Sequence, residues 1–106
     1  IYLTDVEWRS ALGAIREAAA PTCRILLREP MATGARLTLR DHFSEEMSQS
    51  YHATYRNEAT FMQTITEAWG PAGFRLAGKG DVYTDAALNN RSDTHQRWFV
   101  WERSGQ

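Results

Sequence analysis

Residues 23–30 read Cys-Arg-Ile-Leu-Leu-Arg-Glu-Pro, a short apolar run that ends in charge and a proline. A later run, residues 97–102, reads Arg-Trp-Phe-Val-Trp-Glu and has no polar alternation. Such runs are typical of strands buried on both faces, as in α/β sheets that helices cover. Open α/β sheets bind their ligands just outside the carboxyl ends of the strands. We therefore expect Arg28, Glu29 and Pro30 to lie at a ligand-binding edge of a sheet.

Size and charge exclude several classes of protein. The chain has 106 residues, which suits one domain with a real core, and its net charge of −1 creates no broad field for nucleic acid or an anionic membrane. No apolar stretch approaches the roughly 18 residues of a membrane helix, and no signal-peptide pattern is present. The single cysteine, Cys23, excludes an internal disulfide and is typical of a reducing compartment. We expect a cytoplasmic protein with Cys23 in its core.

The first residues predict a strand end followed by a helix. Ile1 to Leu3 are apolar and lack an initiator Met, so we expect a piece of a longer protein that begins within a buried strand. Thr4 and Glu7 match the capping box of a helix N-terminus. Apolar residues at helical spacing follow until a proline stops the pattern. We predict a helix over residues 5–19 and a strand over residues 22–28.

The middle of the chain is harder to interpret. Residues 36–40 alternate like a short, half-exposed strand. Residues 41–56 are polar and aromatic without a convincing period, and we interpret them as an excursion with some helix, above the strand ends. Asn57 can cap a second helix, with Glu58 in its first turn where the helix dipole favours a negative charge.

The last third of the chain predicts two strands. Residues 73–77 and 96–102 have strand character, and a long polar loop joins them without a crossover helix. Strands joined in this way are most simply antiparallel. The expected order is therefore strand end, helix, strand, excursion, helix and antiparallel strand pair, in a single domain without internal repeats.

This order resembles the C-terminal half of class I S-adenosylmethionine-dependent methyltransferases. Tyr2-Leu3-Thr4-Asp5 before an amphipathic helix is similar to the end of the family's fourth strand. Residues 23–30 resemble its fifth strand, which often reads Pro-Gly-Gly-x-Leu-Leu-Leu-x-Glu. Residues 97–102 resemble its terminal strand, which is inserted antiparallel.

Two further segments carry the same resemblance. Tyr55-Arg56-Asn57-Glu58 followed by Phe61 resembles the Tyr-Arg-Ser-x-x-x-Phe start of the family's next helix, and residues 73–76 resemble its Ala-Gly-Phe end. The resemblance implies an α/β fold with a partial Rossmann-like sheet, in which residues 1–106 form the C-terminal part of a methyltransferase-like domain.

The chain departs from the family in the part that binds the cofactor. The family's glycine-rich loop, which binds the methionine end of the cofactor, and the acidic residue that binds its ribose have no counterpart here. Residues 78–81, Gly-Lys-Gly-Asp, follow a late strand and predict a turn. The resemblance therefore implies that S-adenosylmethionine binds only together with a missing N-terminal half, supplied by an upstream segment or a partner chain.

Asp5 and Glu29 are the first candidate site residues. The resemblance places Asp5, with Leu3 and Thr4, where the family contacts its cofactor; from the residues alone, Asp5 is equally a first-turn acid that stabilises a helix. Glu29 at a strand end could accept a proton or orient an amine nucleophile. Alternatively, Glu29 simply pairs with Arg28.

The histidines of the excursion are the other candidate bases. A neutral imidazole can take a proton near neutral pH, so His42 and His52 join Glu29 as predicted catalytic residues, although both are alternatively ordinary surface histidines. Their spacing matches no zinc site, and we expect no metal. The predicted substrate-binding residues are Arg28, Asp41, Tyr51, Tyr55 and Arg56.

The resemblance implies methyl transfer to an oxygen or nitrogen of a small-molecule or peptide acceptor, with this chain on the substrate side of the cleft. The alternative is a non-catalytic α+β module whose excursion holds a protein partner. A hydrolase lacks the Gly-x-Ser-x-Gly turn that it would need. The tryptophans lie at core-like spacings, so we expect no platform for stacking nucleic-acid bases.

Overall fold

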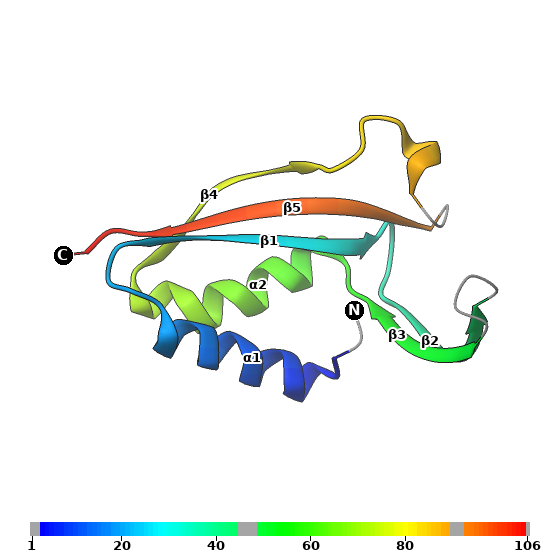
Figure 1. Ribbon diagram of the computed structural model, residues 1–106, viewed down its shortest axis with the longest axis horizontal. Helices are drawn as coiled ribbons and strands as arrows, with labels where there is room; N and C mark the ends of the chain where they lie inside the picture. Colours follow the sequence, from blue (N-terminus) through cyan, green and yellow to red (C-terminus); the bar gives the residue numbers. More distant parts are fainter. Residues whose placement is uncertain (1–2, 45–48, 90–92, 106) are drawn as a thin grey trace.

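The computed structural model describes residues 3–44, 49–89 and 93–105. Within them, helices alternate with antiparallel strands, so the fold is a mixture of helix and sheet (Figure 1). In chain order the elements are α1 (Asp5–Ala18), β1 (Cys23–Ala32), β2 (Leu37–Ser44), β3 (Gln49–Tyr55), α2 (Glu58–Trp69), the 3-10 turn η1 (Gly70–Ala72), β4 (Phe74–Asp81), the 3-10 turn η2 (Ala86–Leu88) and β5 (Thr94–Arg103).

The main sheet has the strand order β1-β5-β4, and β5 is antiparallel to both neighbours. Cys23 lies opposite Arg103 and Ala32 opposite Thr94, so β1 and β5 pair along their whole lengths. This confirms that residues 23–30 and 97–102 are neighbouring strands, and that the last two strands are an antiparallel pair. Because both β1 and β4 oppose β5, they run in the same direction on either side of it.

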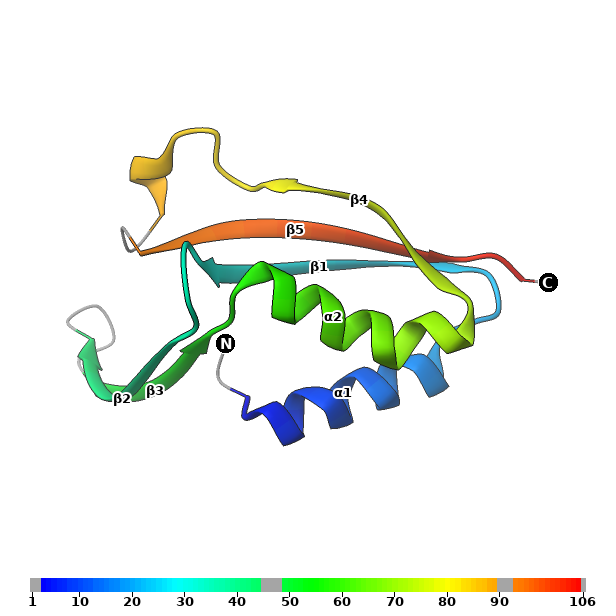
Figure 2. The same cartoon turned by 180° about the vertical axis from the view of Figure 1, so that it is seen from behind.

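Both helices lie on the same side of this sheet (Figures 1 and 2). Their apolar stripes pack against every second residue of the strands, which is the spacing of one face of a strand. Cys23 is half-buried against this core, as predicted. The fully enclosed centre of the core consists of Leu12, Met31, Phe61, Ile65, Trp69 and Phe99.

The prediction that β1 is buried on both faces is wrong. Ile25 and Leu27 pack against the core, whereas Leu26 is 67% exposed on the opposite face. No helix in the described part of the chain covers that second face (Figure 2). A continuous apolar run therefore marks, in this strand, one buried face and one open face.

The strand is also longer than predicted. We expected it to end at Arg28, but β1 continues to Ala32, so Arg28, Glu29 and Pro30 lie within the strand and not at its carboxyl end. β1 has only one neighbour in the sheet, and an edge strand uses only every second N–H group for that neighbour. Pro30, which lacks an N–H group, is therefore compatible with this strand.

Where the structure describes it, the predicted excursion consists of two paired strands, the β2–β3 hairpin, and contains no helix. β2 pairs antiparallel with β3, with Leu37 opposite Tyr55 and His42 opposite Tyr51. The register shifts between Leu39 and His42. A bulge of this kind breaks the alternation of apolar and polar residues, which explains why the sequence shows a strand over residues 36–40 and no clear period after it.

The two helices agree with the sequence prediction to within one residue. Thr4 caps α1 through a complete capping box with Glu7, and Asn57 Oδ1 accepts from the Thr60 amide at the start of α2. After α2 the chain turns through η1, and Gly73 adopts a φ of 93°, a left-handed conformation that favours glycine. No helix among the described residues is long and apolar enough to cross a membrane.

Candidate functional site

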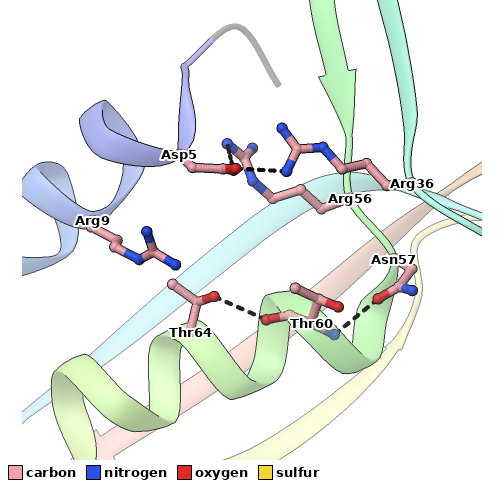
Figure 3. A pocket seen from close by; sticks show the side chains of 7 residues that line it. All are labelled: Asp5, Arg9, Arg36, Arg56, Asn57, Thr60 and Thr64. Carbon is pink, nitrogen blue, oxygen red and sulfur yellow. Dashed lines mark hydrogen bonds and ion pairs between the residues drawn. The ribbon is translucent and has the colours of Figure 1, made fainter.

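A pocket lies between the N-terminal ends of the two helices and the chain segment that leads into β2 (Figure 3). Its volume is about 80 Å³. Its walls are polar side chains and arginines that come from three separate segments of the chain. The lining residues are Asp5, Arg9, Arg36, Arg56, Asn57, Thr60 and Thr64.

Among the described residues, Asp5 is the only carboxylate that lines the pocket. Its Oδ2 accepts a 2.6 Å hydrogen bond from Arg36 Nη1, and its Oδ1 lies 3.3 Å from Arg56 Nη2. The hydrogen bond from Arg36, together with the positive charges of both arginines, outweighs partial burial and lowers the pKa of Asp5 from its ordinary value. Asp5 is therefore a carboxylate at neutral pH, with both oxygens already bound.

Arg56 is the buried cation of the site. Its side chain is only 6% exposed. Its Nη2 also donates to the Leu3 carbonyl at 2.9 Å, and its guanidinium lies 5.8 Å from the ring of Trp8. Its Nε is buried without a hydrogen-bond partner in the described structure. A buried donor is normally satisfied, so this unpaired Nε adds to the cost of burying the Arg56 guanidinium.

The other polar groups come from one face of each helix. Arg9 follows Asp5 by one helical turn, and in Figure 3 its guanidinium extends across the pocket toward Thr64. The Thr64 hydroxyl donates to the Thr60 carbonyl at 3.0 Å within α2. The pocket thus presents cationic donors, two threonines and the N-terminal end of a helix.

The structure brings together some of the predicted site residues. Asp5 and Arg56 meet at the pocket, although they are 51 positions apart in the chain. Leu3 joins them through its carbonyl, while the Thr4 side chain is used for capping α1. Tyr55, the last residue of β3, is buried and directly precedes Arg56.

Arg28 and Glu29 do not line the pocket. They are consecutive residues of β1, so their side chains point to opposite faces of the sheet. Arg28 Nη2 donates to the Tyr83 hydroxyl at 3.1 Å, and Glu29 lies opposite Arg97 in the strand register. The ligand-binding edge that the sequence predicted at these two residues is therefore not formed by a strand end.

The remaining candidates lie on the β2–β3 hairpin. Asp41 and His42 belong to β2, and Tyr51 and His52 belong to β3. The backbone pairing places His42 opposite Tyr51. The side chains of these residues lie outside the described part of the structure.

The sequence analysis missed five residues that line the pocket, of which it named Asn57 only as a helix cap: Arg9, Arg36, Asn57, Thr60 and Thr64. A signal for part of this set is present in the sequence. Arg9 follows Asp5 by four residues. Thr60 follows Asn57 by three and Thr64 follows Thr60 by four, so each group lies on one helix face. Arg36 comes from a separate segment, and no local spacing indicates its contact with Asp5.

A second charged cluster joins α2 to the sheet. Glu58 accepts from Lys79 Nζ and from Arg97 Nε, each at 2.8 Å, and Arg97 Nη1 lies 3.0 Å from Asp81. Burial alone would raise the pKa of Glu58, but the hydrogen bonds from Lys79 and Arg97 prevail and lower it. This cluster pairs two cations with two anions, so its charges balance.

No protein-family model, curated protein or solved structure matches the chain. Within the described residues, no group of three His, Cys, Asp or Glu side chains is placed to hold a metal ion. The functional assignment therefore depends on the fold and on the pocket at Asp5 and Arg56.

Proposed function

We propose that this chain is the substrate-side half of an S-adenosylmethionine-dependent methyltransferase, acting on an oxygen or nitrogen acceptor. The observation that supports this most is the position of β5, between β1 and β4 and antiparallel to both. The family resemblance implies such a terminal strand, inserted antiparallel beside the strand of residues 23–30. In this proposal the sheet is part of a Rossmann-like sheet.

The pocket gives the proposal a second support. The resemblance assigns Asp5 to the cofactor side and Arg56 to the substrate side, and these two side chains lie 3.3 Å apart. A methyltransferase needs the cofactor and the acceptor to meet at one place, so adjacent residues with these two roles suit the reaction.

The described residues fit one wall of a cofactor site, because Asp5 remains 43% exposed while its oxygens are held by two arginines. When bound, S-adenosylmethionine supplies a methyl group on a positively charged sulfur. The chain's own residues would orient the acceptor and remove one proton from it. Arg56 and its neighbours would hold the acceptor, and His42 or His52 on the hairpin would take the proton; Glu29, which lies outside this pocket, would have no part in this step.

The test is calorimetric titration of S-adenosylmethionine into the natural protein that contains residues 1–106, beside the same titration of these residues alone. We expect saturable binding to the natural protein and none to the isolated residues. A folded natural protein that gives no binding heat, and has no glycine-rich strand-loop-helix before Ile1, would overturn the proposal.

A non-catalytic interaction module is the second candidate. The β2–β3 hairpin extends beyond the end of the main sheet and is placed to contact a protein partner (Figure 1). A natural reading frame that begins near Ile1, and a chain that is a well-behaved monomer, would favour this function. A sheet half with an unpaired edge along β1 is instead expected to associate.

A further inference from the structure

We infer that the pocket at Asp5 and Arg56 binds an anionic group, a carboxylate or a phosphate, and that this group belongs to the methyl acceptor. The assignment to the acceptor rests on the proposed function. The binding of the anion does not, because it follows from the charges, the burial and the donors of the pocket itself.

The first argument is the charge of the pocket. Of the residues that the structure describes, Arg9, Arg36 and Arg56 line it against one carboxylate, that of Asp5. Asp5 is already bound by Arg36 and Arg56, and Arg9 has no ion-pair partner in the described part of the chain. The site therefore keeps a formal excess of two positive charges when all its own pairs are made.

The charged cluster at Glu58 shows what a balanced arrangement looks like in this chain. There, Lys79 and Arg97 face Glu58 and Asp81, and each charge has an opposite partner within 3.0 Å. A charged cluster whose role is only to hold a helix against a sheet needs no cation without an anionic partner. The pocket differs from this cluster in its excess positive charge, which a bound anion would neutralise.

The second argument is the burial of the Arg56 guanidinium, whose charge lies at the pocket wall. The side chain is 6% exposed and its Nε has no partner. Burial of a guanidinium is costly unless its donors are used. Carboxylates and phosphates accept from two donors of one guanidinium at once, which is the geometry that arginine provides best.

The third argument is the end of α2. Asn57, Thr60 and Thr64 place an amide and two hydroxyl groups on the pocket wall, in the first turns of a 12-residue helix. The positive end of the helix dipole favours negative charge at this position. A volume of about 80 Å³ has room for several waters or for one small polyatomic group.

The experiment uses the reaction of phenylglyoxal with arginine in the natural protein, read residue by residue by mass spectrometry of peptides. Labelling is measured in HEPES with increasing inorganic phosphate or acetate, and ionic strength is held constant with chloride. Arg24 and Arg75, which are 71% and 74% exposed on the open face of the sheet, are internal controls within the same sample.

We expect phosphate or acetate to slow the labelling of Arg9 and Arg36 at least threefold, with saturation, while Arg24 and Arg75 react as in chloride. The anion that protects at the lower concentration identifies the preferred group. Equal protection of all four arginines, or none at Arg9 and Arg36, would overturn the anion site.

A matched pair of variants separates this inference from the proposed function. Arg9→Gln should weaken protection of Arg36 by phosphate at least fivefold, and Arg75→Gln should leave it unchanged. If phosphate protects the pocket arginines but the protein does not bind S-adenosylmethionine, the anion site stands and the methyltransferase proposal fails. If the protein binds S-adenosylmethionine but phosphate does not protect these arginines, the methyltransferase proposal stands and the anion site fails. If S-adenosylhomocysteine itself competes with phosphate for the pocket, the anion belongs to the cofactor and the assignment to the acceptor is wrong.

Discussion

The indole Nε1 of Trp69 donates a 2.9 Å hydrogen bond to the carbonyl oxygen of Leu12, and neither residue has exposed surface. This bond joins α2 to α1 at the centre of the core. The ring of Trp69 also lies edge-on to Trp101, at 5.9 Å between centroids. The bond therefore couples the two helices, and the pocket lies at their other, N-terminal ends.

Trp69→Phe should therefore destabilise the protein more than Trp101→Phe. Both rings are buried, but Trp101 Nε1 has no hydrogen-bond partner in the described structure, whereas Trp69 Nε1 has one. The two substitutions remove the same atoms, so the difference reports the hydrogen bond of the Trp69 indole, about 0.5–1.5 kcal/mol. Urea denaturation of both variants measures it, and equal losses would contradict a structural role of this bond.

Gly80→Ala should destabilise the protein by about 1–3 kcal/mol. A Cβ atom at Gly80 would lie 2.9 Å from the indole of Trp98, which covers this part of β4 on the open face of the sheet. Gly13→Ala is the control, since a Cβ atom there meets nothing within 4 Å and alanine favours helix. We expect Gly13→Ala to be stabilising by about 0.5–1 kcal/mol. A Gly80→Ala variant with unchanged thermal midpoint would mean that Trp98 does not lie over this strand.

The ion pairs of Asp5 predict a pH dependence of stability. The pKa of Asp5 is lowered in the folded state, chiefly by the hydrogen bond from Arg36. The ionised carboxylate therefore stabilises the fold above the ordinary aspartate pKa, and this stabilisation is lost as the pH falls through the pKa that Asp5 has in the folded protein. Wild type should be more stable than Asp5→Asn at pH 7, and the gap should close below about pH 4. Denaturant titrations at pH 7, 5, 4 and 3 test this. A gap that is constant over this range would show that the charge of Asp5 does not stabilise the fold.

The charged cluster at Glu58 predicts that removing this carboxylate lowers the free energy of unfolding by an amount that depends on salt. Glu58→Gln weakens two ion pairs and leaves Arg97, which is only 16% exposed, with Asp81 alone. We expect a cost of about 1 kcal/mol that is smaller in 1 M salt. Glu67→Gln is the control, because in the described structure this exposed carboxylate of the same helix accepts only from Gln63, and its loss should cost less. Equal costs for the two variants would contradict the role of the cluster.

Local signals in the sequence predicted both helices well. Thr4 with Glu7 and Asn57 with Glu58 mark the helix starts, because capping depends on groups a few residues apart. Composition also indicated that residues 23–30 and 97–102 are strands, since both runs are apolar, whereas their pairing was expected only from the family resemblance. These features need no knowledge of distant contacts.

The rest of the fold and the pocket depend on contacts between residues far apart in the chain, which local sequence patterns do not predict. The alternation of β2 is broken by its bulge, so the hairpin was interpreted as an excursion with some helix. Pro30 suggested a strand end, but an edge strand accepts it. The pairing of Arg36 with Asp5 joins positions 31 apart, and it is visible only once the helix and the hairpin are placed together.

The most direct test of the proposed function is the affinity of the natural protein for S-adenosylhomocysteine, measured by calorimetry for wild type, Asp5→Asn and Arg75→Gln, with circular dichroism to verify folding. We predict one saturable site in wild type, at least tenfold weaker binding in Asp5→Asn, and unchanged binding in Arg75→Gln. A folded wild-type protein that does not bind, or an Asp5→Asn variant that binds as tightly as wild type, would contradict the proposal.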